Sequence, residues 1–235
     1  MKINNSVRVA LAGAAIAGVT IALPGVAFAA TPATFAQAQQ KLEQQLADRV
    51  AQLGRLSADI TSSKTLTTGH ANLLSARIAT ETASINALVA KVPNDTTMAE
   101  LNADRAAMLR DNRVYAVETP QVIETIEADS IAAQVSVFRS DEASLQTSIS
   151  SLSGQPGYQN ALNHYNSFVV AVNHASQDTV KGTHAVLAQV PQDFPGDTYV
   201  FVNANRQLLA AGIALAHATY DESVIGLATG GYTGS

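Results

Sequence analysis

The sequence predicts an all-α protein of six helices, arranged as two tandem three-helix antiparallel bundle units. Three observations lead to this fold class. Apolar residues recur at helical spacing along most of the chain, and glycine and proline fall almost entirely between the periodic segments. In addition, two stretches of the first half are similar to two stretches of the second half, which indicates an internal duplication. One compact six-helix bundle is the alternative.

The chain of 235 residues begins with the features of a secretory signal peptide. Lys2 and Arg8 flank a polar start, the uncharged run Val9–Leu23 follows, and a small-residue cleavage pattern, "AFA", ends at Ala29. The run is shorter than the roughly 20 apolar residues that span a bilayer, so a cleaved signal is favoured over an anchor. We therefore expect residues 1–29 to be removed and the protein to be secreted or otherwise extracytoplasmic.

Composition excludes several classes of function. The sequence contains 14 lysines and arginines against 19 acidic residues, and its formal net charge is −5. It has no basic cluster to neutralise phosphates, so we expect neither nucleic-acid binding nor stable membrane insertion after signal cleavage. Cysteine is absent, which excludes disulfides, thiolate metal sites and cysteine nucleophiles and leaves the core to hold the fold together.

Three helices are predicted before the middle of the chain. Apolar residues keep helical spacing over Phe35–Ile60, and a polar segment then breaks the pattern. Thr67 or Thr68 caps a second helix, which stops at Pro93–Thr96. A third helix follows, with an apolar stripe that ends at Tyr115.

Pro120 marks the joint between the third and fourth helices. Either Thr119 caps a new helix with proline at its first position, or the helix continues and bends, because proline lacks an amide hydrogen and clashes with the carbonyl of Ala116. We expect one long helix bent near Pro120, which joins helical unit 1 (residues 30–119) to helical unit 2 (residues 120–228).

Three further helices are predicted in the second unit. The fourth helix continues its apolar pattern until Gly154–Gly157, and the fifth extends to about Val190. The sixth covers about Tyr199 to Ala228 and is followed by a flexible tail at 229–235. One histidine and two acidic residues in the sixth helix are costly in hydrocarbon, so we interpret it as a buried soluble helix. Most aromatic side chains lie near the apolar stripes and are expected in the core: Tyr115, Tyr158, Tyr165, Phe168, Tyr199, Phe201 and Tyr220.

The internal duplication depends on two matches that occur in the same order. "ALVAKVPND" (Ala87–Asp95) and "AVLAQVPQD" (Ala185–Asp193) are identical at five of nine positions, at an offset of 98. "LNADRAAML" (Leu101–Leu109) matches "VNANRQLLA" (Val202–Ala210) at an offset of 101. Their order and their equivalent places in the helical pattern suggest a duplicated three-helix unit.

Two arginines at equivalent positions of the repeat interrupt apolar stripes. Arg105 and its counterpart Arg206 each fall between apolar residues. A guanidinium that faces a core needs a carboxylate partner, and helical spacing places Glu81 at about the level of Arg105. We therefore predict a Glu81–Arg105 contact and an Asp178–Arg206 contact. Structural ion pairs are the favoured interpretation, and a pocket for an anionic ligand is the alternative.

Four acidic residues, Glu118, Glu124, Glu127 and Asp129, flank or follow Pro120. Acidic residues suit the first turn of a helix, whose free amide groups carry partial positive charge. We therefore favour a solvated helix start. The same four residues are the candidates for a ligand or cation site.

Motifs for catalysis and metal binding are missing. The sequence has no Gly-x-Ser-x-Gly, Ser-x-x-Lys, His-Glu-x-x-His or Glu-x-x-His pattern and no phosphate-binding glycine loop. His217 and Asp221 are spaced i, i+4, but one such pair does not define a metal site. We predict a non-enzymatic protein with no catalytic residue, metal or cofactor.

The segments "LTTGHANLLSARIATETASINALVAKVPNDTTMAELNADRAAML" and "RVYAVETPQVIETIEADSI" resemble a group of uncharacterised secreted helical proteins of high-GC Gram-positive bacteria. In that group a signal peptide precedes helices that end in an Arg-Val-Tyr segment and a proline. The resemblance covers about Leu42 to Ile131. It implies an exported all-α protein and no particular activity.

Together these observations predict a secreted or cell-envelope-associated protein that acts as a structural or interaction module. Other envelope proteins or cell-wall components are the expected partners. A small-ligand- or metal-binding extracytoplasmic helical bundle is the alternative function.

Overall fold

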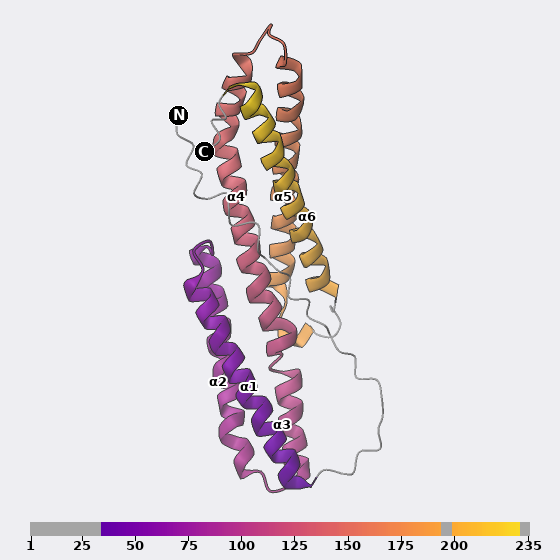
Figure 1. Cartoon of the computed structure of the whole chain (residues 1–235). Coiled ribbons are helices and arrows are strands. Elements are labelled where there is room, and N and C mark those ends of the chain that lie inside the picture. The colour runs from indigo at the N-terminus through magenta and orange to yellow at the C-terminus, as the bar shows by residue number, and fades with distance from the viewer. Residues whose placement is uncertain (1–33, 194–198, 231–235) are drawn as a thin grey trace. The chain divides into compact units, whose positions relative to one another are not determined.

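The computed structural model describes residues 34–193 and 199–230, and within these ranges the chain is all-helical, with no strand. Figure 1 shows how the helices follow one another. The predicted signal segment and the last five residues of the predicted tail lie outside the described residues. The α-helices are α1 (Phe35–Ser62), α2 (Thr68–Lys91), α3 (Met98–Arg110), α4 (Thr119–Ser150), α5 (Tyr158–Ala188) and α6 (Tyr199–Ala228).

Local capping sets where the first helices begin. Thr34 accepts the backbone amide of Gln37, whose side chain in turn accepts the Thr34 amide, so α1 starts with a capping box. Thr67 caps α2 by accepting the amide of His70, which confirms one of the two predicted caps. A second capping box, between Thr97 and Glu100, starts α3.

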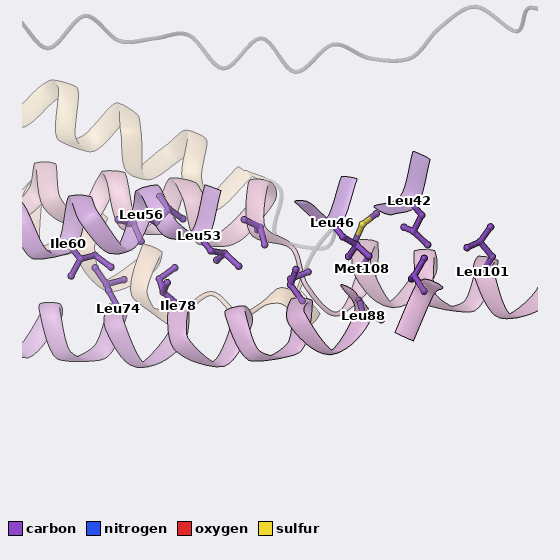
Figure 2. Close-up of a cluster of buried hydrophobic side chains, with 14 residues drawn as sticks. Leu42, Leu46, Leu53, Leu56, Ile60, Leu74, Ile78, Leu88, Leu101 and Met108 are labelled. Atoms are coloured by element: carbon purple, nitrogen blue, oxygen red, sulfur yellow. The ribbon is translucent and has the colours of Figure 1, made fainter. Parts of the chain in front are cut away.

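The first hydrophobic core lies between α1, α2 and α3 (Figure 2). Each of these helices contributes one apolar stripe at helical spacing, because side chains three and four residues apart lie on the same face. The start of α4 adds Val122 to the same cluster. The best-covered members include Leu42, Leu46, Leu53, Leu56, Leu74, Ile85 and Met108.

The second core lies between α4, α5 and α6, and α5 and α6 make the most extensive helix–helix contact. Alanines on the facing sides allow close approach of the helices, and Phe138 of α4 meets Phe168 of α5 edge to face, with ring centroids 5.7 Å apart. A smaller cluster is formed by Ile149, Ala161 and Ile225. These residues lie near the carboxyl ends of α4 and α6 and the amino end of α5.

The prediction of one long helix with its bend near Pro120 is wrong about where the helix is interrupted. The break lies at residues 111–113, after which a π-helical turn, η3 (Val114–Glu118), leads directly into α4. Asn112 ends the preceding helix, because its side chain donates to the carbonyl of Ala107 (3.3 Å). Pro120 falls in the first turn of α4, where a missing amide hydrogen removes little.

The first repeated segment has the same local structure in both copies. In each, a long helix ends and a one-turn 3₁₀ helix follows, η2 (Val92–Asn94) after α2 and η4 (Pro191–Asp193) after α5. The second match does not keep its buried face: Leu101 is buried in α3, whereas its counterpart Val202 is exposed in α6. A shift of one residue rotates a helix face by about 100°. The sequence match therefore pairs residues of α3 and α6 that lie on different faces of their helices.

We expect Leu74→Ala to lower the free energy of unfolding by about 2–5 kcal/mol, because Leu74 is fully buried and its removal leaves a cavity. The adjacent Leu73, which is 40% exposed, supplies the matched control. Urea unfolding followed by circular dichroism measures both variants. Equal losses for Leu73→Ala and Leu74→Ala would contradict the described orientation of α2.

Candidate functional site

The carboxyl end of α5 is held by side chains from two other helices. Arg77 of α2 donates to the carbonyls of Leu187 (2.9 Å) and Gln189 (3.2 Å). Gln121 of α4 donates to the carbonyls of Val186 (2.8 Å) and Gln189 (3.1 Å). The last turn of a helix leaves carbonyls without intrahelical partners and carries partial negative charge. These two side chains therefore satisfy the end of α5 and connect it to both cores.

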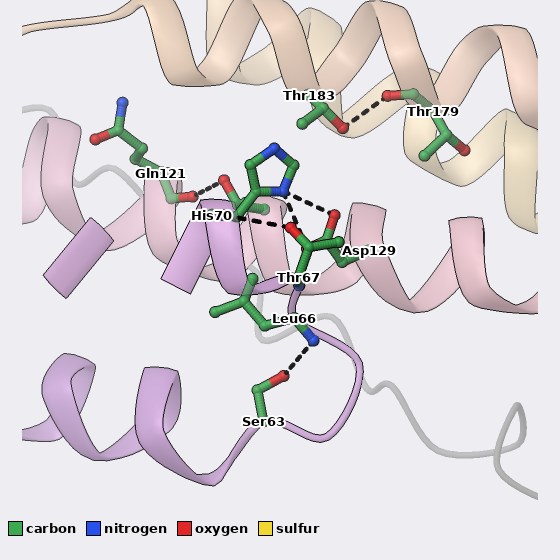
Figure 3. Close-up of polar contacts among 9 residues, drawn as sticks. Ser63, Leu66, Thr67, His70, Gln121, Asp129, Thr179 and Thr183 are labelled. Atoms are coloured by element: carbon green, nitrogen blue, oxygen red, sulfur yellow. Dashed lines mark hydrogen bonds and ion pairs between the residues drawn. The ribbon is translucent and has the colours of Figure 1, made fainter. Parts of the chain in front are cut away.

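The amino end of α2 is held in a similar way by a carboxylate of α4 (Figure 3). Asp129, which is buried, accepts the backbone amide of Thr67 (2.7 Å) and the Nδ1 hydrogen of His70 (2.9 Å). A carboxylate is favourable here because the free amides of a helix start carry partial positive charge. Asp129 is thus a helix cap supplied by another helix.

A groove of about 550 Å³ lies beside this contact, and we call it the His70 groove. His70, Asp129 and His184 line it together with Thr179 and Thr183 of α5. Both threonine hydroxyls donate to carbonyls of their own helix, at 2.7 and 2.8 Å. The Thr67 hydroxyl accepts the backbone amide of His70, but no hydroxyl among the described residues hydrogen-bonds to the His70 ring, whose Nδ1 contacts Asp129.

A second cleft, of about 240 Å³, lies where α2 meets η3 and the segment Gln189–Pro191; we call it the acid cleft. Glu118, only 2% exposed, lines it, and so do Glu81 and Arg77. The Oε2 atoms of Glu118 and Glu81 are buried and have no hydrogen-bond partner. Arg77 cannot fully compensate, because its guanidinium donates to carbonyls of the α5 end.

Burial controls the protonation of this cleft. Desolvation raises the pKa of Glu81 to about 7, and the nearby charge of Glu118 adds to the shift. Desolvation also raises the pKa of Glu118, against the opposing effect of the Arg77 charge. An unpartnered buried carboxyl is costly when it is ionised, so burial favours the protonated form of both acids in this cleft.

The predicted ion pairs are not formed by the predicted residues. Arg105 is exposed, and Glu81 lies at the acid cleft instead. The ionic contact between α2 and α3 joins Lys91 to the buried Asp104. Asp104 shares the inward face with Leu101 and Met108, whereas Arg105 is one helical step, about 100°, further round.

The predicted Asp178–Arg206 contact is likewise absent from the contacts of the described residues. Asp178 lies 3.9 Å from Lys181 on the same helix, and Arg206 is exposed on α6. The i, i+4 residues His217 and Asp221 do not meet either: His217 is exposed, and Asp221 binds Nδ1 of His164 on α5 at 2.7 Å.

The expectation of a solvated start to the fourth helix is wrong. Glu118, Glu124 and Asp129 are buried, and Glu127 alone of the four predicted candidates is exposed. Desolvation, with repulsion from Glu127, raises the pKa of Glu124 to about 8. The four acids do not form one site: Glu118 lines the acid cleft and Asp129 lines the His70 groove.

One side of α6 is exposed although it carries large apolar side chains. Tyr199, Arg206, Ile213, Tyr220 and Leu227 follow one another at intervals of seven residues. The expectation that Tyr199 and Tyr220 belong to the core is therefore wrong, and Tyr115 of η3 is exposed as well. We call the six exposed apolar residues the outer face of α6: Tyr199, Val202, Leu209, Ile213, Tyr220 and Leu227.

Comparison of the chain with protein-family models, with curated proteins and with solved structures finds no match. In the described ranges, no three histidine or acidic side chains are grouped as a metal ion requires. None of the described helices combines the length and apolarity that a bilayer crossing needs. The chemistry of the clefts and of the outer face of α6 is therefore the basis for assigning a function.

Replacing Glu124 with glutamine is expected to stabilise the protein at alkaline pH. The pKa of this carboxyl lies at about 8 in the folded protein, above its ordinary value of 4.5. Its contribution to stability is therefore complete below pH 4.5 and is lost as the pH rises through about 8. Each pKa unit corresponds to about 1.4 kcal/mol, so Glu124→Gln should gain a few kcal/mol at most at pH 8.5.

Urea unfolding midpoints at pH 4.5 and pH 8.5 measure this effect. The same change at Glu43, an exposed residue of α1, provides the control and should leave both midpoints nearly unchanged. A Glu124→Gln gain that is the same at both pH values would show that ionisation of the buried carboxyl is not its cause.

Proposed function

We propose that the protein is a non-enzymatic structural module of two tandem three-helix units, exported from the cytoplasm, that associates with a second copy of itself. Self-association uses the outer face of α6. The features that support export are the signal-like first 29 residues and the resemblance of residues Leu42 to Ile131 to secreted helical proteins. The single observation that carries the interaction is the exposed apolar seam of α6.

The seven-residue interval of the outer face favours another helix as its partner. A position repeated every seven residues stays aligned with a second helix when the two supercoil, because 3.5 residues per turn keep the seam facing inward. Val202 and Leu209 lie three residues after Tyr199 and Arg206, which gives the alternating three–four spacing of such seams. Isolated exposed apolar residues need no explanation, but a seam along the whole helix does.

Size and charge favour a second copy over a lipid surface. The helix has 30 residues and is about 45 Å long. Its six outer side chains expose on the order of 600 Å², close to the about 800 Å² per partner that a standard interface buries. Arg206 is the one lysine or arginine of α6, whereas helices that lie on anionic membranes are flanked by several.

The outer face is also complementary to itself. Arg206 and Tyr220 lie at equal distances along the helix on either side of Ile213. A two-fold axis near Ile213 would therefore bring Arg206 level with Tyr220 of the partner subunit, where a cation–π contact is favourable. A methyl group added at Gly212, beside this centre, would meet only open space, so no contact within the chain requires a glycine there. A glycine on this surface instead allows the close approach of a second helix.

Leu209→Glu is expected to convert dimers to monomers, because the charge would be buried in the proposed interface. Leu109 of α3 is the matched control, since it is the same residue type and equally exposed, 48% against 49% for Leu209. Sedimentation velocity of the full chain at increasing concentration gives the oligomeric state of each variant. A monomeric wild type, or equal association of both variants, would refute self-association through α6.

Export is tested by the amino terminus of the protein isolated from its producing cells. Cleavage after Ala29 would leave Ala30 as the first residue, and the protein should occur in the culture medium or the envelope fraction. Amino-terminal sequencing of each fraction makes the measurement. A cytoplasmic protein that begins at Met1 would contradict this part of the proposal without bearing on association through α6.

A further inference from the structure

The acid cleft contains two carboxyl groups with buried oxygens that receive no hydrogen bond, and a hydroxyl that faces it as an acceptor. The Oε2 atoms of Glu81 and Glu118 are buried without partners. Thr80, which also lines the cleft, donates its hydroxyl hydrogen to the carbonyl of Ala76 (3.0 Å), so towards the cleft it offers only lone pairs. Arg77, the one cation in the lining, directs its guanidinium at the end of α5. The carboxamide of Gln189 also lines the cleft, but neither buried carboxyl oxygen receives a hydrogen bond from it.

The charge of the cleft is also unbalanced. Two carboxylates and one guanidinium line it, so its net charge is −1 when both acids are ionised. Asp193 is the nearest titratable group of η4, and it accepts the amide of Val190 (3.2 Å) rather than facing a cation. A single positive charge would neutralise the lining and allow both buried carboxyls to ionise.

We propose that the acid cleft binds a small organic monocation that carries a primary ammonium group. An ammonium group has three N–H donors, which matches the three acceptors of Glu81, Glu118 and Thr80. Apart from the side chains of Arg77 and Gln189, the remaining lining is apolar, with Leu73, Val190 and Pro191, and suits a short hydrocarbon body. This inference is independent of the proposed association through α6.

A metal ion fits the cleft less well than an ammonium group. Two carboxylates are present, but the described residues provide no third histidine or acidic side chain to complete a set. The volume of about 240 Å³ also exceeds what a single ion needs. At about 30 Å³ for one water, it matches a ligand of roughly five to ten non-hydrogen atoms.

The depth of Glu118 separates the roles of the two acids. Glu118 is almost completely buried and forms the floor, whereas Glu81 is only half-buried and lies nearer to solvent. Binding of the cation releases to solvent whatever proton Glu81 carries, since the bound charge favours the carboxylate. Affinity should therefore increase with pH through the titration of Glu81, whose pKa is about 7.

Butylammonium chloride is the probe, titrated into the ¹⁵N-labelled full chain and followed by amide chemical shifts. We expect saturable shifts at Arg77, Glu81, Glu118 and Val190, and about tenfold tighter binding at pH 8 than at pH 6. Butan-1-ol, which has the same hydrocarbon body without the charge, should not bind. Potassium chloride at equal ionic strength controls for salt.

Two glutamine variants make the assignment specific. Glu118→Gln removes the charge on the floor and should abolish the saturable shifts. Glu124→Gln removes another buried carboxyl with a raised pKa, but it lies outside the cleft lining and should bind as the wild type does. Circular dichroism establishes that both variants are folded.

Several outcomes would overturn the proposal. These are the absence of saturable binding, equal binding of butan-1-ol, equal binding of potassium ions, or equal loss of binding in the Glu118→Gln and Glu124→Gln variants. A Glu118→Gln variant that is folded and still binds at wild-type affinity would also exclude this cleft. None of these results depends on whether the chain forms dimers.

Discussion

The hydrogen bonds at the carboxyl end of α5 are the constraint on which the arrangement of the two cores depends. A helix that ends against other helices leaves carbonyl groups that water reaches poorly, and an unsatisfied buried group costs about 1–3 kcal/mol. Here Arg77 and Gln121 supply the donors from α2 and α4, so the end of α5 is satisfied only while all three helices stay together. Asp129 performs the complementary task at the start of α2, where free amides need an acceptor. Opposite ends of two helices are thus completed by side chains from elsewhere in the chain.

Because Arg77 donates to the carbonyls at the end of α5, the neighbouring acid cleft has acceptors that it does not satisfy. Arg77 is the cation best placed to neutralise Glu118, but its guanidinium is already committed to carbonyl groups. Glu118 and Glu81 therefore share a cleft with unpartnered oxygen atoms, and burial raises the pKa of both carboxyls. A structural role alone would be served better by glutamine, which is uncharged and has donors. The presence of two acids at the place where donors are scarce is what makes an external donor a reasonable occupant.

Helix bounds and helix caps could be predicted, because they depend on residues that are neighbours in the sequence. The bounds of α1 and α6 follow from apolar spacing, and the cap Thr67 follows from its hydroxyl before a periodic segment. The break at 111–113 does not follow from apolar spacing, because Asp111, Asn112 and Arg113 interrupt no apolar pattern, although Asp and Asn favour turns. The burial of Glu118 and Asp129 depends on helices distant in the sequence, so a local argument from the helix dipole points to solvent instead. The acid cleft, which combines α2, η3 and the end of α5, has no signal in any single segment.

Helix α6 carries large apolar side chains on both of its sides, because Leu208, Leu215 and Ile225 are buried inside while the outer face is exposed. Its inward side has Ala204, Ala211 and Ala218 at intervals of seven residues, and these small residues let α5 approach closely. Its outward side carries the larger leucine, isoleucine and tyrosine side chains, which gain nothing from contact with water. A helix that is apolar on both sides is ordinarily covered on both sides. An apolar seam outside a closely packed interior supports the proposal that a second surface meets it, and a seam in which Arg206 is the one cation suits another copy of the same helix better than an anionic membrane.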